Sequence, residues 1–138
     1  MRQAQTTLAF ETRGRDLLEI TGEVGEWLRS TRLTAGVLTL FCRHTSASLL
    51  INENAAPAVR RDLMRWLDMA APEGDGYEHD AEGPDDMPAH IKAMLTGNGL
   101  TIPFADGKML LGSWQGIYLA EHRDVGSRRY VVLHAMGD

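Results

Sequence analysis

Two short apolar runs on either side of a polar segment constrain the fold of this chain most strongly. Val37 to Phe41 and Leu49 to Ile51 are rich in residues that favour β-strands. An imidazole, three hydroxyls and a carboxylate lie within the segment from His44 to Asn54. A polar group buried in a strand without a hydrogen-bond partner costs about 1–3 kcal/mol. The segment therefore predicts two neighbouring strands whose polar groups either satisfy one another or line a pocket.

The spacing of apolar residues extends this pattern along the whole chain. Strands are expected at 5–12, 17–20, 34–43, 46–52, 100–104, 109–113, 115–122 and 129–135. Helices are expected at 22–31 after Thr21 as N-cap, at 55–69 with Pro57 in the first turn, and at 88–95 before a closing Gly97. The sum is a single α+β domain over residues 1–138, with seven or eight mostly antiparallel strands and about three helices.

The helix expected at 55–69 brings charged residues close to its apolar face. Its apolar stripe consists of Val59, Leu63, Trp66 and Leu67. Asp62 lies beside this stripe, so the helix can carry a carboxylate to the rim of a pocket. Arg60 and Arg61 are expected to form a solvated face. The acidic segment 71–88 that follows is rich in Gly and Pro, and loops of this length are usually functional or disordered.

Composition argues against several classes of protein. A formal net charge of −5 and a pI near 5.5 argue against a general nucleic-acid binder, which carries a basic stripe. Cys42 is the only cysteine, so no disulfide forms within the chain. No segment reaches the roughly 20 apolar residues of a membrane span, and the N-terminus lacks the apolar core of a signal peptide. A cytoplasmic protein without a membrane partner is expected.

Three of the five histidines occupy distinct junctions of the expected fold. His44 lies between two strands, His79 in the acidic loop, and His90 at the start of the short helix. Imidazoles with neighbouring carboxylates would suit zinc or another borderline divalent cation, although this spacing matches no recognised metal motif. His122 is expected to be solvent-exposed at a turn, and His134 to be an ordinary strand residue.

Carboxylates and hydroxyls supply further candidates for chemistry. Glu53 ends the polar strand, and Gln115 and Glu121 share one otherwise apolar strand face. Glu121 is either functional or paired with Arg128 or Arg129. No Gly-rich phosphate loop and no GxSxG elbow is present. Phosphate could instead be bound by the hydroxyl side chains Thr45, Ser46 and Ser48.

Four longer strings, in matching order and spacing, identify a resemblance to the YjbQ family. They are HTSASLLINEN at 44–54, VRRD at 59–62, YEHDAEGPDDMPAHIKAML at 77–95 and LLGSWQGIYLAEHR at 110–123. The resemblance covers nearly the whole chain. It implies an α+β sandwich that assembles as a homotrimer, with a polar pocket near a subunit boundary. Some relatives have Asn where this chain has Asp85-Asp86, which leaves a ligand role for these two residues open.

The resemblance also implies an activity and a set of site residues. Family members are often described as secondary thiamine-phosphate synthase enzymes, transferases that join a pyrimidine pyrophosphate to a thiazole phosphate. The implied ligands of a divalent metal ion, zinc or magnesium, are His44, His79 and His90. The implied catalytic residues are Glu53, Asp62, Gln115 and Glu121. The implied contacts to a small phosphorylated metabolite are Thr45, Ser46, Ser48 and Arg128.

Three hypotheses for the function remain open at this point. The first is a metal-dependent enzyme that acts on a phosphorylated small molecule, with thiamine-phosphate synthesis as its main or a side activity. Dedicated thiamine-phosphate synthases use a TIM-barrel phosphate site that a chain of this length cannot build. The second is a trimeric module that binds a metal or metabolite without turnover. The third is a structural trimer whose polar residues satisfy one another.

Overall fold

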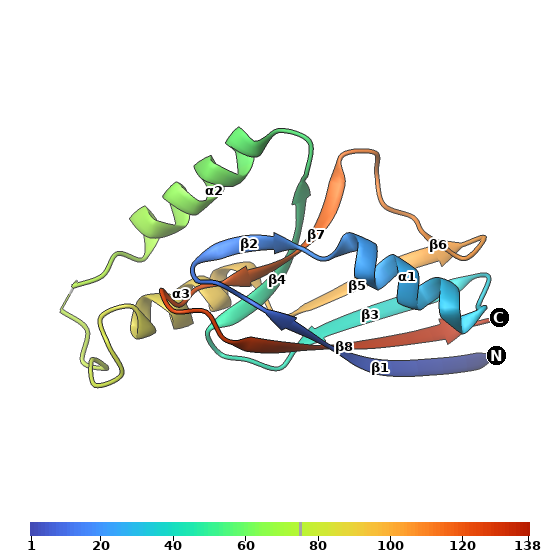
Figure 1. Cartoon of the computed structure of the whole chain (residues 1–138), viewed down its shortest axis with the longest axis horizontal. Helices are drawn as coiled ribbons and strands as arrows, with labels where there is room; N and C mark the ends of the chain where they lie inside the picture. Colours follow the sequence, from blue (N-terminus) through green and yellow to red (C-terminus); the bar gives the residue numbers. More distant parts are fainter. Residues whose placement is uncertain (75) are drawn as a thin grey trace.

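Two antiparallel sheets pack face to face around the hydrophobic core (Figure 1). The computed structural model describes residues 1–74 and 76–138, so Asp75, inside the loop predicted at 71–88, lies outside the described residues. Within them the elements are β1 (Arg2–Glu11), β2 (Asp16–Glu19), α1 (Thr21–Thr31), β3 (Gly36–Cys42), β4 (Ala47–Glu53), α2 (Pro57–Ala70), α3 (Asp86–Thr96), β5 (Gly99–Ala105), β6 (Lys108–Met109), β7 (Gln115–Glu121) and β8 (Arg128–Gly137). The expected α+β fold is confirmed.

The larger sheet has the strand order β1-β8-β3-β5-β6 in the described part of the chain. β1 and β8 pair along their whole length, from Arg2 opposite Gly137 to Glu11 opposite Arg128. Side chains alternate across the sheet, and the core side of β8 is formed by the buried residues Val131, Leu133 and Ala135. The alternation therefore turns the side chains of the other face of this sheet toward solvent.

The smaller sheet has the order β2-β7-β4, and its central strand is covered on both faces. Ile117 and Leu119 of β7 join the main core between the sheets. Tyr118 and Ala120, on the opposite face, pack with Leu17 in a second apolar cluster. Burial on both faces explains why this strand reads as a nearly continuous apolar run.

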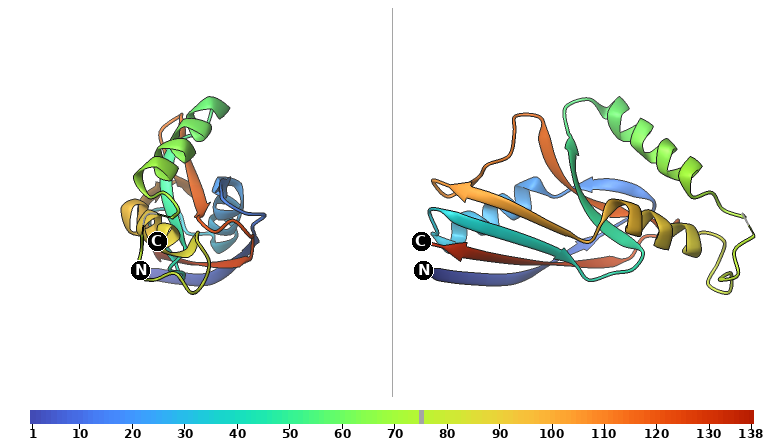
Figure 2. Two further views of the ribbon diagram at one scale, coloured as in Figure 1. Left: turned by 90° about the vertical axis from the view of Figure 1, so that its left-hand side faces the viewer. Right: turned by 180° about the vertical axis from the view of Figure 1, so that it is seen from behind.

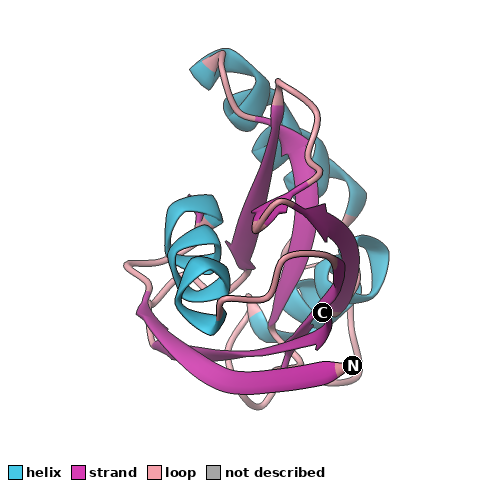
Figure 3. Cartoon of the chain, turned by 90° about the vertical axis from the view of Figure 1, so that its right-hand side faces the viewer, coloured by secondary structure: helices cyan, strands magenta, loops and turns pink. Residues whose placement is uncertain are grey.

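Two of the helices, α1 and α3, lie against the sheets, and α2 extends away from them (Figure 2). α1 inserts Val24 and Leu28 into the main core, near the end of the molecule where both termini lie (Figure 3). α3 packs against β4. α2 projects beyond the sheets and buries Leu67, whereas Trp66, expected in its apolar stripe, is 59% exposed. No helix of the described residues is long and apolar enough to cross a membrane.

Three local expectations are corrected by the structure. Thr21 is the first residue of α1 rather than its N-cap, because its hydroxyl accepts the Ile117 N–H at 2.8 Å. The strand expected at 109–113 is shortened to β6, since the Gly112 N–H bonds to Gln115 Oε1 in a turn. α3 begins at Asp86, two residues earlier than expected, which places Pro88 in its first turn, where its missing N–H is tolerated.

Candidate metal centre

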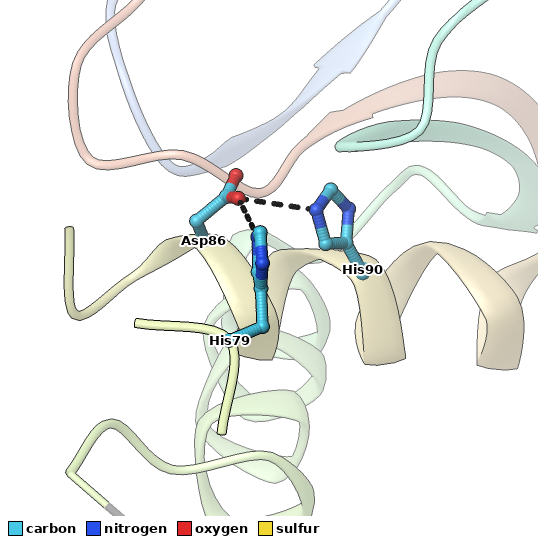
Figure 4. A group of neighbouring side chains, drawn as sticks. All are labelled: His79, Asp86 and His90. Atoms are coloured by element: carbon cyan, nitrogen blue, oxygen red, sulfur yellow. Dashed lines mark hydrogen bonds and ion pairs between the residues drawn. The ribbon is translucent and has the colours of Figure 1, made fainter. Parts of the chain in front are cut away.

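The side chains of His79, Asp86 and His90 converge at the start of α3 (Figure 4). Asp86 Oδ2 lies 2.8 Å from His79 Nε2 and 3.1 Å from His90 Nε2. The three ligand atoms all lie within 4.8 Å of one another. Two imidazoles and a carboxylate are the donor types that catalytic zinc sites use, with a further position left for water or substrate. The cluster therefore has the composition and the spacing of a divalent-cation site.

Helix geometry explains how two of these side chains meet. Asp86 and His90 are four residues apart on α3, so they lie one above the other on the same face of the helix. His79 comes from the preceding loop and completes the cluster from outside the helix. The pair Asp86–His90 is a local signal that the sequence contains, and it depends on α3 beginning at Asp86.

A hydrogen bond from the second ring nitrogen fixes the orientation of His90. His90 Nδ1 donates to the backbone carbonyl of Thr45 at 2.8 Å, and this bond directs Nε2 of the ring at Asp86 Oδ2, 3.1 Å away. A backbone carbonyl behind the outer imidazole nitrogen is the common arrangement at metal-binding histidines.

Arg123 holds the carboxylates at the start of α3 in place. Its guanidinium donates to Asp86 Oδ1 at 2.8 Å, to Asp85 Oδ2 at 2.9 Å and to the Glu82 carbonyl. Burial alone would raise the pKa of Asp86, but the hydrogen bond from His79 and the charges of His90 and Arg123 outweigh it and lower the pKa. Asp86 is therefore a carboxylate at neutral pH. Sequence reasoning did not single out Arg123, because its partners lie about 40 residues away in the chain.

A cavity of about 590 Å³ lies next to this cluster and shares His90 with it. The remaining wall includes His44, Thr45, Met94 and Asn98. This volume falls in the range of about 300–1,000 Å³ that is usual for small-molecule sites. A ligand in the cavity would thus contact one residue of the His79, Asp86 and His90 cluster.

His44 lines this cavity, but the structure does not bring it to His79 and His90. Its Nε2 accepts the Tyr130 N–H at 2.8 Å, and its Nδ1 lies 3.4 Å from Arg129 Nη1. Burial and the charge of Arg129 lower the pKa of His44. Because Nε2 is occupied by a backbone donor, His44 does not take the ligand position expected from the sequence. Asp86 completes the cluster instead.

Two of the three hydroxyls expected to bind phosphate are hydrogen-bonded to other side chains inside the protein. Ser46 Oγ accepts Arg129 Nη2 at 3.0 Å, and Ser48 Oγ is hydrogen-bonded to His122 Nε2 at 2.8 Å. Both serines are buried, whereas Thr45 reaches the cavity. Arg128, the fourth residue of this predicted set, is 61% exposed and lies 3.8 Å from Glu11. Of the four residues expected to contact phosphate, only Thr45 therefore lines the cavity.

Glu121 is paired with an arginine, which was the structural alternative for this residue. Its carboxylate is 1% exposed and forms a two-point ion pair with Arg129, including Arg129 Nε to Glu121 Oε1 at 2.7 Å. Thr12 donates to Oε1 as well. Burial alone would raise the pKa of Glu121, but the bonds from Arg129 and Thr12 outweigh it and lower the pKa. Glu121 therefore neutralises a buried guanidinium, and the structure does not place it at the cavity.

The other three predicted catalytic residues lie apart from the cluster. Glu53 and Gln115 pair at one end of the smaller sheet, whereas Ala47 and Glu121 pair at the other. Six residue steps along a strand separate these ends by about 20 Å. The carboxylate of Glu53 accepts the Ala56 N–H before α2, and Gln115 bonds within its own turn. Asp62 is exposed on α2. Within this chain these residues do not form one site with His90.

His122, expected at the surface, is 1% exposed inside the protein. Its Nδ1 has no hydrogen-bond partner among residues 1–74 and 76–138. Burial, with the charge of Lys92, lowers its pKa to about 4. The expectation is wrong because β7 continues its buried pattern into His122, whose backbone N–H bonds to the Ser46 carbonyl.

This buried imidazole is expected to make the protein sensitive to acid. The His122 imidazole has a pKa near 6.5 in the unfolded chain and about 4 in the folded chain. The free energy of unfolding therefore falls as the pH drops from 6.5 to 4. The expected contribution is about 3 kcal/mol at the lower end. Urea unfolding of wild type and His122→Gln between these pH values measures it, and the variant should lose less stability. An equal loss in both proteins would contradict this assignment.

Comparison with known proteins finds the same architecture and extensive sequence similarity. The family model described as UPF0047 protein YjbQ-like matches residues 6–138. The UPF0047 protein YjbQ of Escherichia coli O157:H7 is 41% identical over 97% of this chain and 98% of its own length. The UPF0047 protein sll1880 of Synechocystis is 41% identical over 99% of this chain and 94% of its own.

Two solved structures agree with the fold. A YjbQ/UPF0047 family protein from Clostridium acetobutylicum has a TM-score of 0.88 at 36% identity, over 95% of this chain and 99% of that one. A YbjQ-like protein of unknown function from Sulfolobus solfataricus P2 has a TM-score of 0.92 over 99% of both chains. The second is 21% identical, so it supports the fold alone.

Proposed function

The chain belongs to the YjbQ (UPF0047) family, and from this premise we propose that it is a metal-dependent enzyme acting on a phosphorylated small molecule. The proposed ligands of the cation are His79, Asp86 and His90. The observation that carries the proposal is the convergence of three ligand atoms within 4.8 Å beside a cavity of about 590 Å³.

The donor set favours zinc over magnesium as the cation. Two imidazole nitrogens and one carboxylate oxygen suit zinc or another borderline ion, whereas magnesium prefers oxygen ligands and retained water. When bound, such an ion supplies positive charge for a phosphoryl oxygen or a departing pyrophosphate. The chain's own part is to orient His90 through the Thr45 carbonyl, to keep Asp86 charged through Arg123, and to hold the organic part of the substrate in the cavity.

Thiamine-phosphate synthesis is the candidate reaction, as the principal or a side activity. It joins a pyrimidine pyrophosphate to a thiazole phosphate and releases pyrophosphate, whose negative charge a cation at this cluster would neutralise. The proposal extends to a cytoplasmic homotrimer. Self-association is supported by exposed apolar side chains on the open face of the larger sheet, which a second copy would cover: Val37, Phe41, Tyr130 and Met136.

The test is formation of thiamine phosphate by wild type and by His79→Ala, each supplied with zinc or magnesium. We expect the variant to lose at least about 100-fold in rate, since loss of residues that only support metal ligands already costs about 10–100-fold. His134→Ala is the matched control, because His134 lies on β8 and bonds to Gln5. Wild-type protein that binds metal but forms no product would favour a binding module without turnover. Equal rates in wild type and His79→Ala would contradict metal dependence.

A further inference from the structure

A second pocket, of about 350 Å³, lies between α2 and the start of β2, and four arginines line it. Three of them, Arg60, Arg61 and Arg65, belong to α2, and Arg15 precedes β2 on the opposite wall. None of these residues contributes to the metal cluster or to the larger cavity. The pocket is therefore separate from the site proposed above.

Helix spacing concentrates positive charge on one side of α2. Arg61 and Arg65 are four residues apart, so their side chains are neighbours, and like charges at this spacing are unfavourable by a few tenths of a kcal/mol. In the described residues, neither they nor Arg60 forms a salt bridge with a carboxylate. The helix thus holds like charges together without an acidic partner inside the protein.

The two carboxylates of the pocket are already bonded to groups other than the three arginines of α2. Asp68 Oδ1 accepts the Lys92 ammonium at 2.8 Å and lies 3.2 Å from Arg15 Nη1. Lys92 is itself buried, so its pairing with Asp68 is required to compensate its charge. Asp16 accepts the backbone N–H of Leu17. The guanidinium groups of α2 can therefore pair with an anion from solution.

Arg60 is held in position by contacts that leave hydrogen-bonding capacity unused. Its guanidinium carbon lies 5.9 Å from the centre of the Tyr118 ring, in cation–π contact. Its Nε is buried and has no hydrogen-bond partner among the described residues. Because this nitrogen is closed to solvent, an anion in the pocket would contact the terminal nitrogens of the guanidinium instead.

We infer that this arginine pocket binds a phosphate-bearing small anion, such as a diphosphate. Guanidinium groups bind phosphate oxygens through two parallel hydrogen bonds, and several of them together select a multiply charged group. The chain as a whole carries a formal charge of −5, so the pocket is a local exception to its acidity. A concave site of this volume suits a small ligand, whereas nucleic acid requires an extended basic stripe.

The probe for the test is inorganic pyrophosphate, titrated calorimetrically into protein treated with EDTA to remove metal ions. We expect one pyrophosphate per chain, with binding weakened at least about tenfold in Arg61→Gln and in Arg65→Gln and lost in the double variant. Both side chains are exposed, so the variants should fold, as circular dichroism would verify. Arg29→Gln removes the same charge from α1 and should bind as wild type does.

His90→Ala separates this inference from the proposed function. The variant lacks a ligand of the metal cluster, and it should still bind pyrophosphate as tightly as wild type. Absence of saturable binding at millimolar pyrophosphate would overturn the inference, and so would equal weakening by Arg29→Gln and Arg61→Gln. Tighter binding of a single-stranded oligonucleotide through the same arginines would overturn it in favour of a nucleic-acid surface.

Discussion

Replacement of Arg129 by methionine is expected to lower the free energy of unfolding by about 3–5 kcal/mol. The carboxylate of Glu121 is 1% exposed, and Arg129 supplies its neutralising charge through two points of contact. The same guanidinium donates to Ser46 Oγ, so the substitution also removes a partner of the polar segment that precedes β4. A buried charge without its partner is among the most destabilising single changes in a protein. Urea unfolding followed by circular dichroism at neutral pH measures the loss.

The neighbouring residue on β8 provides the matched control. Arg128 has the same charge but is 61% exposed and lies 3.8 Å from its nearest carboxylate, so Arg128→Met should change stability by less than about 0.5 kcal/mol. Glu121→Gln combined with Arg129→Met should recover part of the loss, because no unpaired charge then remains buried. Equal effects of the two arginine substitutions would exclude a special role for the buried pair.

Zinc affinity is expected to fall at least about 100-fold in His90→Ala. The substitution removes one of the three converging donors and also the bond to the Thr45 carbonyl that orients it. Competition with a chromogenic chelator measures the dissociation constant over the required range. His44→Ala, on the wall of the same cavity but outside the cluster, should change the affinity less than about threefold. A larger effect of His44→Ala than of His90→Ala would restore the ligand set expected from the sequence.

Local sequence signals were sufficient for most of the fold. Apolar alternation located the long strands, Pro57 marked the first turn of α2, and Gly97, with φ of 98°, closed α3 as expected. The errors occurred where tertiary contacts decide the outcome. Trp66 has helical spacing with Leu63, yet α2 projects from the sheets and leaves the indole exposed. Thr21 was assigned a capping role because its bond to Ile117 depends on a strand 96 residues away.

The candidate site was predicted in part, and the missing part has a physical explanation. His79 and His90 were expected as ligands, and the structure brings them together. The ligand role of Asp86 was left open because some relatives have Asn there, and the start of α3 expected at Pro88 hid its spacing of four residues from His90. Glu53 lies outside the cluster of His79, Asp86 and His90, because the register of β4 is set by its pairing with β7, a strand distant in the sequence. The set implied by the resemblance therefore includes residues at opposite ends of the smaller sheet, about 20 Å apart.

The central claim, a divalent cation bound by His79, Asp86 and His90, is tested most directly by a zinc-soaked crystal measured at the zinc absorption edge. The account predicts one anomalous peak per chain, about 2.0–2.1 Å from His79 Nε2 and His90 Nε2 and about 2.0–2.2 Å from Asp86 Oδ2. The Thr45 carbonyl should remain the partner of His90 Nδ1. A zinc ion bound at His44 instead, or no ordered ion at the start of α3, would contradict the account.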